Sequence, residues 1–305
     1  MNMGAMVPDE LVTLRDFLRF AITRFSEAKI AFGHGTNNAF DEAAYLLLHA
    51  LSLPIDRLEP FLDARLTTAE RAKVAALLAR RIDERIPAAY LTGEAWLGNF
   101  RFHVDQRVVI PRSFIAELLP DGLLPYIEDA DAIRRALDLC TGSGCLAILL
   151  AHAYPNADID AIDLSPDALD VAEQNVADYG LGDRIELIQS NLFAGLRGRT
   201  YDLIVSNPPY VTTRAMQSLP PEYRCEPALA LAGGDDDGME AVRAIVDAAP
   251  AFLNDHGVLV VEVGNGKAAV EATFPDLPFV WLVTRSSNDA VFLLTRDDFA
   301  SCSVT

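Results

Sequence analysis

One polar turn in this chain combines an amide side chain, two prolines and an aromatic ring. Residues 206–211 read Ser-Asn-Pro-Pro-Tyr-Val and follow the apolar run Tyr-Asp-Leu-Ile-Val at 201–205, which is typical of a buried strand. The two proline rings fix φ and hold Asn207 in an extended conformation. We therefore expect a stiff turn at the carboxyl end of a strand, where open α/β sheets bind ligands.

The turn is suited to holding a planar amide or amino group. The Asn207 side-chain oxygen and the Pro208 carbonyl could each accept one N–H bond from such a group. Pro208 and Pro209 would form a flat floor, and Tyr210 could pack against the face of the group. The alternative is a strand that simply ends in a proline-rich turn. A cofactor site earlier in the chain would favour the binding interpretation.

A glycine-containing segment at 138–145, Asp-Leu-Cys-Thr-Gly-Ser-Gly-Cys, has the features expected of such a cofactor site. Its glycines would let a ligand approach the backbone, and the helix that follows would point N–H groups outward. Asp138, Thr141, Gly142 and Gly144 are the candidate cofactor residues here. The motif alone is weak, because many nucleotide-binding folds share it.

Polar residues also follow the next two expected strands. Asp163 ends a strand about 20 residues on, where an acidic residue can accept hydrogen bonds from ribose hydroxyls. Asn191 and Leu192 follow a third strand and could border an adenine ring by amide and apolar contact. With Asn207, four successive strands each bring a polar side chain to one edge of the sheet.

The sequence offers no obvious general base, nucleophile elbow or metal site. The five histidines lie away from these strand ends in the sequence, and Cys140, Cys145, Cys225 and Cys302 form no Cys-x-x-Cys pair. Methyl transfer from a sulfonium fits this pattern, because the leaving group is released neutral. Such a reaction mainly requires the alignment of nucleophile, methyl group and sulfur.

Two regions with different patterns must position these residues. Residues 8–94 predict helices, with apolar faces at Leu11–Phe25 and at Phe40, Ala44, Leu47 and Leu51, and a capping box at Thr67–Glu70. Residues 96–102 and 103–110 predict a hairpin. A helix is expected over 114–126, with Ser113 as its N-cap.

From about residue 134 the chain alternates strands and helices. Expected strands are 136–140, 159–162, 185–189, 201–206 and 258–263, with helices at 144–154, 165–179, 239–253 and 267–274. Ser165 and Pro166 would cap the second of these helices. The closing pair 279–283 and 290–294 lacks a helix between its strands. We therefore expect an α/β fold, with a mostly parallel sheet and one antiparallel strand.

Composition limits the classes of function. The 305 residues are 51% hydrophobic, carry a formal net charge of −19 and contain no long uncharged apolar stretch, so no membrane span is expected. No secretory signal is visible, which predicts reduced thiols and a cytoplasmic location. The negative charge disfavours nucleic acid and favours a basic protein partner. It would also serve solubility alone.

Taken together, these motifs resemble the class I S-adenosylmethionine-dependent methyltransferases that modify amide or exocyclic amino nitrogens. Further segments narrow the resemblance to the HemK-type protein-glutamine N5-methyltransferases and cover about residues 10–296. They are Arg85-x-Pro-x-x-Tyr90-x-x-Gly93, Ile110-Pro111-Arg112, and Glu226-Pro227-Ala228-Leu229-Ala230-Leu231 with Gly233-Gly234.

The resemblance implies three domains and a set of roles. Residues 1–95 would be a helical substrate-docking domain, 96–112 a β-hairpin linker, and 113–305 a Rossmann-like catalytic domain that binds S-adenosylmethionine. Asn207, Pro208 and Tyr210 would be catalytic and, with Pro209, would hold the substrate glutamine. The cofactor would contact Asn207 and the candidate residues after the first three strands, which are Asp138, Thr141, Gly142, Gly144, Asp163, Asn191 and Leu192. The family usually has Asp where this chain has Asn191, which predicts weaker cofactor binding.

The segment from Arg112 to Glu117 resembles the branch that acts on the third large-subunit ribosomal protein, and residues 138–145 and 222–227 favour the same branch. The substrate implied is thus a glutamine of a basic ribosomal protein, with no direct nucleic-acid recognition. Methylation of peptide release factors, adenine-N6 methylation of nucleic acid, a non-catalytic nucleotide-binding scaffold and a nicotinamide-dependent oxidoreductase remain alternatives.

Overall fold

The computed structural model describes residues 8–234 and 236–301. They form two compact units. Unit 1 contains the chain up to Ala95 together with Leu219–Cys225, and unit 2 contains Trp96–Ser218 and the chain from Glu226 onward.

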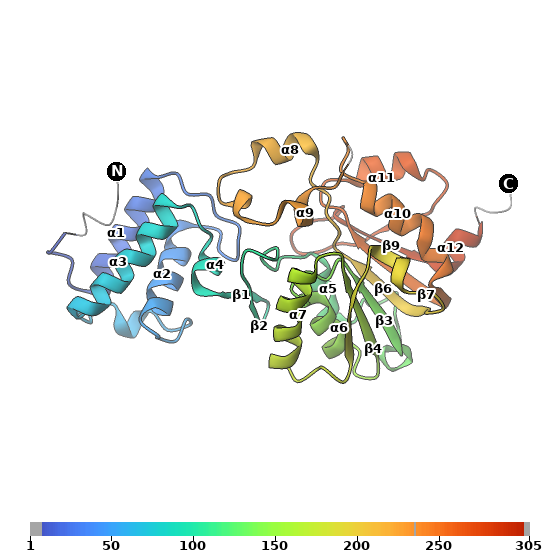
Figure 1. Ribbon diagram of the computed structural model, residues 1–305, viewed down its shortest axis with the longest axis horizontal. Helices are drawn as coiled ribbons and strands as arrows, with labels where there is room; N and C mark the ends of the chain where they lie inside the picture. The colour runs from blue at the N-terminus through green and yellow to red at the C-terminus, as the bar shows by residue number, and fades with distance from the viewer. Residues whose placement is uncertain (1–7, 235, 302–305) are drawn as a thin grey trace. The chain divides into compact units, whose positions relative to one another are not determined.

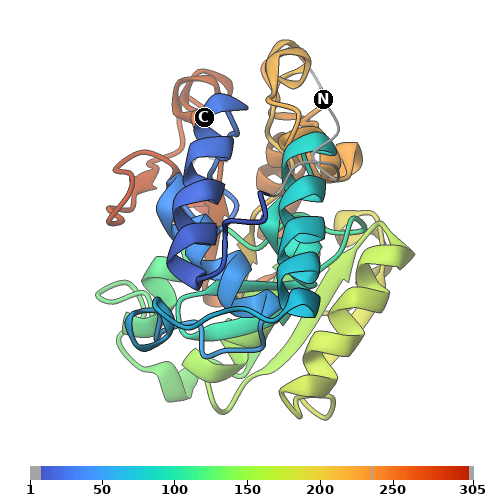
Figure 2. The same cartoon turned by 90° about the vertical axis from the view of Figure 1, so that its left-hand side faces the viewer.

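Unit 1 is built on three amphipathic helices, seen in Figures 1 and 2 as a small bundle. Its helices are α1 (Leu14–Glu27), α2 (Ala39–Ala50), α3 (Thr68–Asp83) and the short α4 (Ala88–Thr92). Their apolar faces meet in one core, which includes Phe17, Phe25, Leu46, Leu47, Val74 and Leu78. Burial of these side chains is the main force that holds the bundle together.

The capping box expected at Thr67–Glu70 is confirmed, whereas one expected apolar face is wrong. The capping box of Thr67 and Glu70 starts α3, because each side chain accepts from the backbone N–H of the other residue. In α2, Phe40 is 49% exposed, although the sequence placed it on the apolar face. That helix packs on both α1 and α3, so its buried side is centred on Ala43, Leu46 and Leu47 instead.

Residues 219–225 belong to unit 1 although they lie far along the chain. Glu222 is fully buried there, and its Oε1 accepts from Arg85 at 3.1 Å and lies 3.6 Å from Nη1 of Arg81. Arg81 is also fully buried and donates to Glu42 at 2.6 Å. The ring of Tyr223 lies 4.1 Å from that of His34. Buried charges are tolerated only when paired in this way.

The segment between the bundle and the large sheet differs from expectation. The hairpin strands are β1 (Glu94–Leu97) and β2 (Phe100–His103), shorter and earlier than expected, because Gly98 turns the chain with φ +60°. The expected helix over 114–126 is reduced to α5 (Ile115–Leu118) and a single 3-10 turn. Pro120 cannot continue the α-helical hydrogen bonds, and Gly122 turns left-handed with φ +62°.

Unit 2 contains a seven-stranded sheet in the order β5-β4-β3-β6-β7-β9-β8. The strands are β3 (Arg135–Leu139), β4 (Asp158–Asp163), β5 (Ile185–Gln189), β6 (Tyr201–Ser206), β7 (Leu253–Glu262), β8 (Val280–Trp281) and β9 (Val291–Thr295). Pairing is parallel from β5 to β7, and β9 runs antiparallel to both β7 and β8. The expected mostly parallel α/β fold is confirmed.

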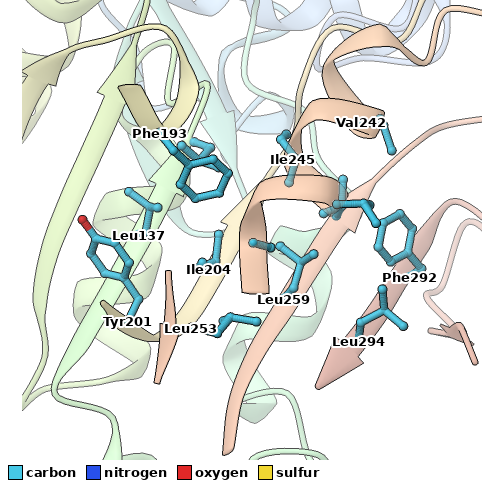
Figure 3. Close-up of a cluster of buried hydrophobic side chains, with 14 of the residues drawn as sticks. Leu137, Phe193, Tyr201, Ile204, Val242, Ile245, Leu253, Leu259, Phe292 and Leu294 are labelled. Atoms are coloured by element: carbon cyan, nitrogen blue, oxygen red, sulfur yellow. The ribbon is translucent and has the colours of Figure 1, made fainter. Parts of the chain in front are cut away.

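Helices connect and cover the strands (Figure 1). They are α6 (Cys145–Ala153), α7 (Pro166–Asp178), α8 (Thr213–Ser218), α9 (Ala228–Leu231), α10 (Glu240–Ala248), α11 (Lys267–Thr273) and α12 (Arg296–Ser301). Residues of the central strands, such as Leu137, Ile204 and Leu259, lie in one buried apolar cluster with Val242 and Ile245 of α10 (Figure 3). Successive side chains of a strand point to opposite faces of the sheet, so a helix that covers one face meets every second residue. Among the described residues, no helix is long and apolar enough to cross a membrane.

The buried pair in unit 1 gives a stability prediction. Replacing Arg81 with Ala would leave the buried carboxylate of Glu42 without its guanidinium partner, and the buried carboxylate of Glu222 would keep only Arg85. We expect a loss of about 3–5 kcal/mol in the free energy of unfolding, measured by urea titration of the purified protein. The matched control is Arg80→Ala, because Arg80 pairs with Glu84 at an exposed site, at 3.7 Å. That change should cost at most about 0.5 kcal/mol. Equal losses in the two variants would contradict this account.

Candidate functional site

The loop between β3 and α6 has an unusual backbone that leaves room for a ligand. Cys140, Gly142 and Gly144 all have positive φ, at +63°, +56° and +78°. A Cβ atom added to Gly142 would meet nothing within 4 Å, so open space lies on that side of the loop. Gly144, in contrast, is closely packed, because a Cβ there would lie only 3.2 Å from that of Ala172, and its positive φ would strain any other residue.

The side chain of Asp138, near the end of β3, holds this loop by hydrogen bonds. Its Oδ2 accepts from the Thr141 hydroxyl at 2.6 Å and from the Ala147 N–H at 2.9 Å. The side chain is fully buried, and burial raises the pKa of Asp138 to about 7, although these two hydrogen bonds act in the opposite direction. Its Oδ1 has no hydrogen-bond partner among the described residues. Such an orphaned buried oxygen calls for a ligand or a water molecule.

Asp163, at the end of β4, joins two neighbouring strand ends. One carboxylate oxygen accepts from the Gly142 N–H at 2.8 Å, and the other accepts from the Ser165 N–H at 2.9 Å. The group is half-buried, and burial raises its pKa. A carboxylate oxygen can accept more than one hydrogen bond, so Asp163 is able to bind a hydroxyl group while it holds the loop.

Asn191 and Leu192 come directly after β5. Asn191 is exposed, and Leu192 is half-buried with φ +47°, against the core that contains Phe193. Since Gln189 of β5 pairs with Asp163 of β4, these residues follow the strand next to the Asp163 loop. Asn191 and Leu192, which are predicted to contact the adenine ring, therefore lie at the same edge of the sheet as Asp163.

Asn207, directly after β6, is oriented by a backbone carbonyl. Its Nδ2 donates to the Arg112 carbonyl at 3.3 Å, which turns the Oδ1 end of the amide away from that carbonyl. Arg112 is itself held by the buried carboxylate of Glu226. Its Nη2 donates to Oε2 at 2.7 Å, and its Nη1 donates to Oε1. Glu226 also accepts from the Ile110 N–H at 2.9 Å. Sequence motifs named these residues but gave no sign of this connection.

The far end of the same turn is held by Tyr210. Its hydroxyl donates to Oε1 of Glu262 at 3.1 Å. A Cβ atom on Gly264 would lie 2.6 Å from the Tyr210 ring, so only glycine fits at that position. Between the two ends, Pro208 is buried and Pro209 is half-buried. The turn is therefore held at both ends by contacts that the sequence did not predict.

Asn175 of α7 is a supporting residue that the sequence did not reveal. It is fully buried, and its Nδ2 donates to the Ser143 carbonyl at 2.8 Å and to the His103 carbonyl at 3.0 Å. Its Oδ1 accepts from the His103 N–H at 2.7 Å. One amide thus ties the glycine loop to β2. A polar residue in the buried face of an expected helix was the only available signal.

The residues present fit a ligand that combines an amino-acid part with a nucleoside. The open side of Gly142, the orphaned oxygen of Asp138 and the carboxylate of Asp163 would face the polar parts, and Leu192 would offer an apolar border. Hydrogen bonds join the Gly142 loop to Asp163, and the parallel pairing of β3 with β6 places Ser206 opposite Leu139. The Asn207 turn therefore starts beside the β3 loop.

Comparison with known proteins identifies the family. The PrmC N-terminal domain family matches residues 16–93, and the methyltransferase small domain family matches residues 121–219. A protein of Bordetella pertussis named ribosomal protein uL3 glutamine methyltransferase is 59% identical over 94% of this chain and 96% of that protein. One of Bradyrhizobium diazoefficiens with the same name is 47% identical over 95% and 92%.

A solved methyltransferase from Pyrococcus furiosus is similar with a TM-score of 0.46, at 15% identity over 66% of this chain and 90% of that one. The sequence relatives carry the assignment, since their identity extends over both units of the chain. The chain belongs to the HemK-type protein-glutamine N5-methyltransferases, which use S-adenosylmethionine, and within them to the group of relatives named for ribosomal protein uL3.

Proposed function

We propose that this protein transfers a methyl group from S-adenosylmethionine to the side-chain N5 of a glutamine in ribosomal protein uL3. The observation that carries the proposal is the fixed amide of Asn207. The hydrogen bond from its Nδ2 to the Arg112 carbonyl leaves Oδ1 as the end of the side chain that can accept from a substrate amide. A close relative bears the name of this activity.

The turn would act on the glutamine by alignment. Asn207 Oδ1 and the Pro208 carbonyl would each accept one N–H of the glutamine amide, which fixes the amide plane. The nitrogen electrons that react lie perpendicular to that plane, so fixing the plane also fixes the direction from which a methyl group can be attacked. The nitrogen would lose one of its two protons when it gains the methyl group, and that proton would pass to solvent. Tyr210 would pack on the opposite face. Effects of this kind can lower a barrier by several kcal/mol, up to about 7–11 kcal/mol.

A second group of residues would hold the cofactor, which supplies an electrophilic methyl group when bound. Thr141, Gly142 and Gly144 would contact its methionine part, with Asp138 beneath them. Asp163 would accept from the ribose hydroxyls, while Asn191 and Leu192 would border the adenine. Asn at 191 can still accept from the adenine amino group, so we expect weaker binding rather than loss of activity.

Charge supports a basic protein as the partner. Unit 2 contains 30 Asp and Glu against 13 Lys and Arg, whereas unit 1 contains 14 against 12. A ribosomal protein must present basic surface to its RNA, so the field of unit 2 would attract it and repel free nucleic acid. A docking role for residues 1–95 stays a prediction, as does the cytoplasmic location where ribosomal proteins are made.

The experiment that tests the function compares three substrates. Newly made uL3, a peptide release factor and a DNA duplex are each incubated with the protein and S-adenosylmethionine, and their intact masses are measured. We expect one methyl group on uL3 alone. Methyl on the release factor would keep the reaction and overturn the substrate, and methyl on DNA would overturn the charge argument. Cofactor binding without methylation of any of the three would indicate a non-catalytic scaffold.

Two substitutions should separate binding of the cofactor from transfer of the methyl group. Asn207→Ala removes the acceptor for the glutamine amide, and we expect kcat to fall by about 100-fold or more, with S-adenosylmethionine affinity within about 3-fold of wild type. Asp163→Asn puts an amide NH2 where the carboxylate accepts two backbone N–H bonds. We expect it to weaken cofactor binding by about 10-fold or more.

Isothermal titration with S-adenosylmethionine and steady-state kinetics on uL3 measure the two effects. The control is Asn254→Ala, which removes an amide that donates to Asp202 at 2.6 Å near the start of β6, at the opposite end of the strand from the turn. That variant should change neither quantity. Wild-type turnover by Asn207→Ala would remove the basis of the proposed mechanism.

A further inference from the structure

Glu262 is a buried carboxylate that the reaction as described does not use. It is the last residue of β7, next to β6 in the sheet, and only 2% of its surface is exposed. The register pairs Ser206 with Val261, so Glu262 lies one residue beyond the point where the Asn207 turn begins. An ionisable group with so little exposure needs partners to stay charged.

Three donors from two other segments converge on this carboxylate. Oε2 accepts from the Ser113 hydroxyl at 2.6 Å and from the Phe114 N–H at 2.8 Å, while Oε1 accepts from the Tyr210 hydroxyl at 3.1 Å. Ser113 lies beside Arg112, whose carbonyl holds Asn207. The segment 112–114 therefore contacts both ends of the Asn207 turn, at one end directly and at the other through Glu262.

The protonation preferences agree with this geometry. Burial raises the pKa of Glu262, and its three hydrogen-bond donors oppose that change. Burial and the nearby charge of Glu262 raise the pKa of Tyr210, so the phenol stays a hydrogen-bond donor. A neutral phenol that donates to a carboxylate forms a charge-assisted hydrogen bond, which is stronger than one between neutral groups.

The Tyr210 ring is thereby confined at two places. Gly264, with φ +54°, lets the backbone come close to the ring, and Glu262 holds the hydroxyl at the far end of the side chain. A tyrosine has only two soft side-chain torsions. Contact along the ring together with a hydrogen bond at its tip fixes both of them.

We propose that Glu262, together with Ser113, positions Tyr210, so that the aromatic ring stays against the glutamine amide during methyl transfer. Glu262 touches neither substrate nor cofactor in this proposal and acts through Tyr210. The inference rests on the proposed function and extends it, because it assigns a role to two residues outside the turn and outside the cofactor loop.

Substitutions at the three positions test the proposal by their effects on kcat and KM. Glu262→Ala removes the carboxylate that accepts all three hydrogen bonds, and we expect kcat on uL3 to fall by about 10- to 100-fold. KM for uL3 and the affinity for S-adenosylmethionine should change by less than about 3-fold, because those contacts lie elsewhere. Glu262→Gln should retain most of the activity, since its oxygen can accept from Ser113 and Phe114 while its NH2 donates to the phenol.

Two milder variants keep the test decisive if Glu262→Ala does not fold. Tyr210→Phe keeps the ring and removes only its hydroxyl, and we expect kcat to fall by about 10-fold. Ser113→Ala should cost less, because Phe114 still donates to the carboxylate. The double variant Glu262→Gln with Tyr210→Phe should be no slower than Tyr210→Phe alone, since the two residues act through one hydrogen bond.

Unit 2 offers a matched control. Tyr201, at the start of β6, donates its hydroxyl to the buried carboxylate of Asp160 at 2.6 Å, at the end of the strand opposite the turn. Tyr201→Phe removes the same hydroxyl from the same kind of partner. It should lower the melting temperature about as much as Tyr210→Phe does, with kcat unchanged.

The possible results are distinguishable. Wild-type kcat in Tyr210→Phe and Glu262→Ala would overturn the positioning role, and so would losses of kcat that merely follow melting temperature across all variants, Tyr201→Phe included. No methyl on uL3 from the wild-type protein would instead mean that the proposed function fails. In that case Glu262 would have no glutamine site to support.

Discussion

The parallel pairing of β3 with β4 on one side and with β6 on the other is the constraint on which the site depends. Parallel strands end at the same edge of a sheet, so every residue just after these strands lies at one edge. The chain must then leave that edge by sharp turns, and it does so with positive φ at Cys140, Gly142 and Gly144 and with two prolines after Asn207. Backbone groups that would otherwise pair within the sheet are thereby turned outward, where a ligand can reach them.

Buried or half-buried carboxylates fix these turns. Asp138 and Asp163 accept from backbone N–H groups of the loop after β3 or the helix that follows it, and Glu226 and Glu262 hold the segment 110–114 beside the Asn207 turn. Each carboxylate loses hydration on burial, and each regains hydrogen bonds only if the loops around it have one conformation. Their role is therefore to make the site rigid before substrates arrive. Alignment is what a reaction without a general base requires.

Local patterns in the sequence predicted the elements whose signals are local. The strand 201–206, the Ser165 cap with Pro166, and the Thr67 capping box all lie within a few residues of the features that specify them. The helix expected over 114–126 failed, because Pro120 and Gly122 outweigh an apolar period.

The sequence could not show which residues, far apart in the chain, pair by hydrogen bonds or charge. Glu262 meets Ser113 across about 150 positions and Glu222 meets Arg81 across about 140, and no pattern of spacing specifies such pairs. For the same reason no local pattern indicated that the segment 219–225 belongs to unit 1. The segment 222–227 was recognised only by its resemblance to a family motif. The fold shows that its two glutamates, Glu222 and Glu226, are buried carboxylates with arginine partners.

The most direct test of the central claim is to locate the methyl group. Newly made uL3 is treated with the protein and isotopically labelled S-adenosylmethionine, digested, and sequenced by tandem mass spectrometry, with Asn207→Ala treated in parallel. We expect label on the side-chain nitrogen of a glutamine in uL3, and labelling about 100-fold or more slower with the variant. Label on a lysine, an arginine or a chain terminus would contradict it, and so would equal labelling by Asn207→Ala, because neither result needs a turn built to hold an amide.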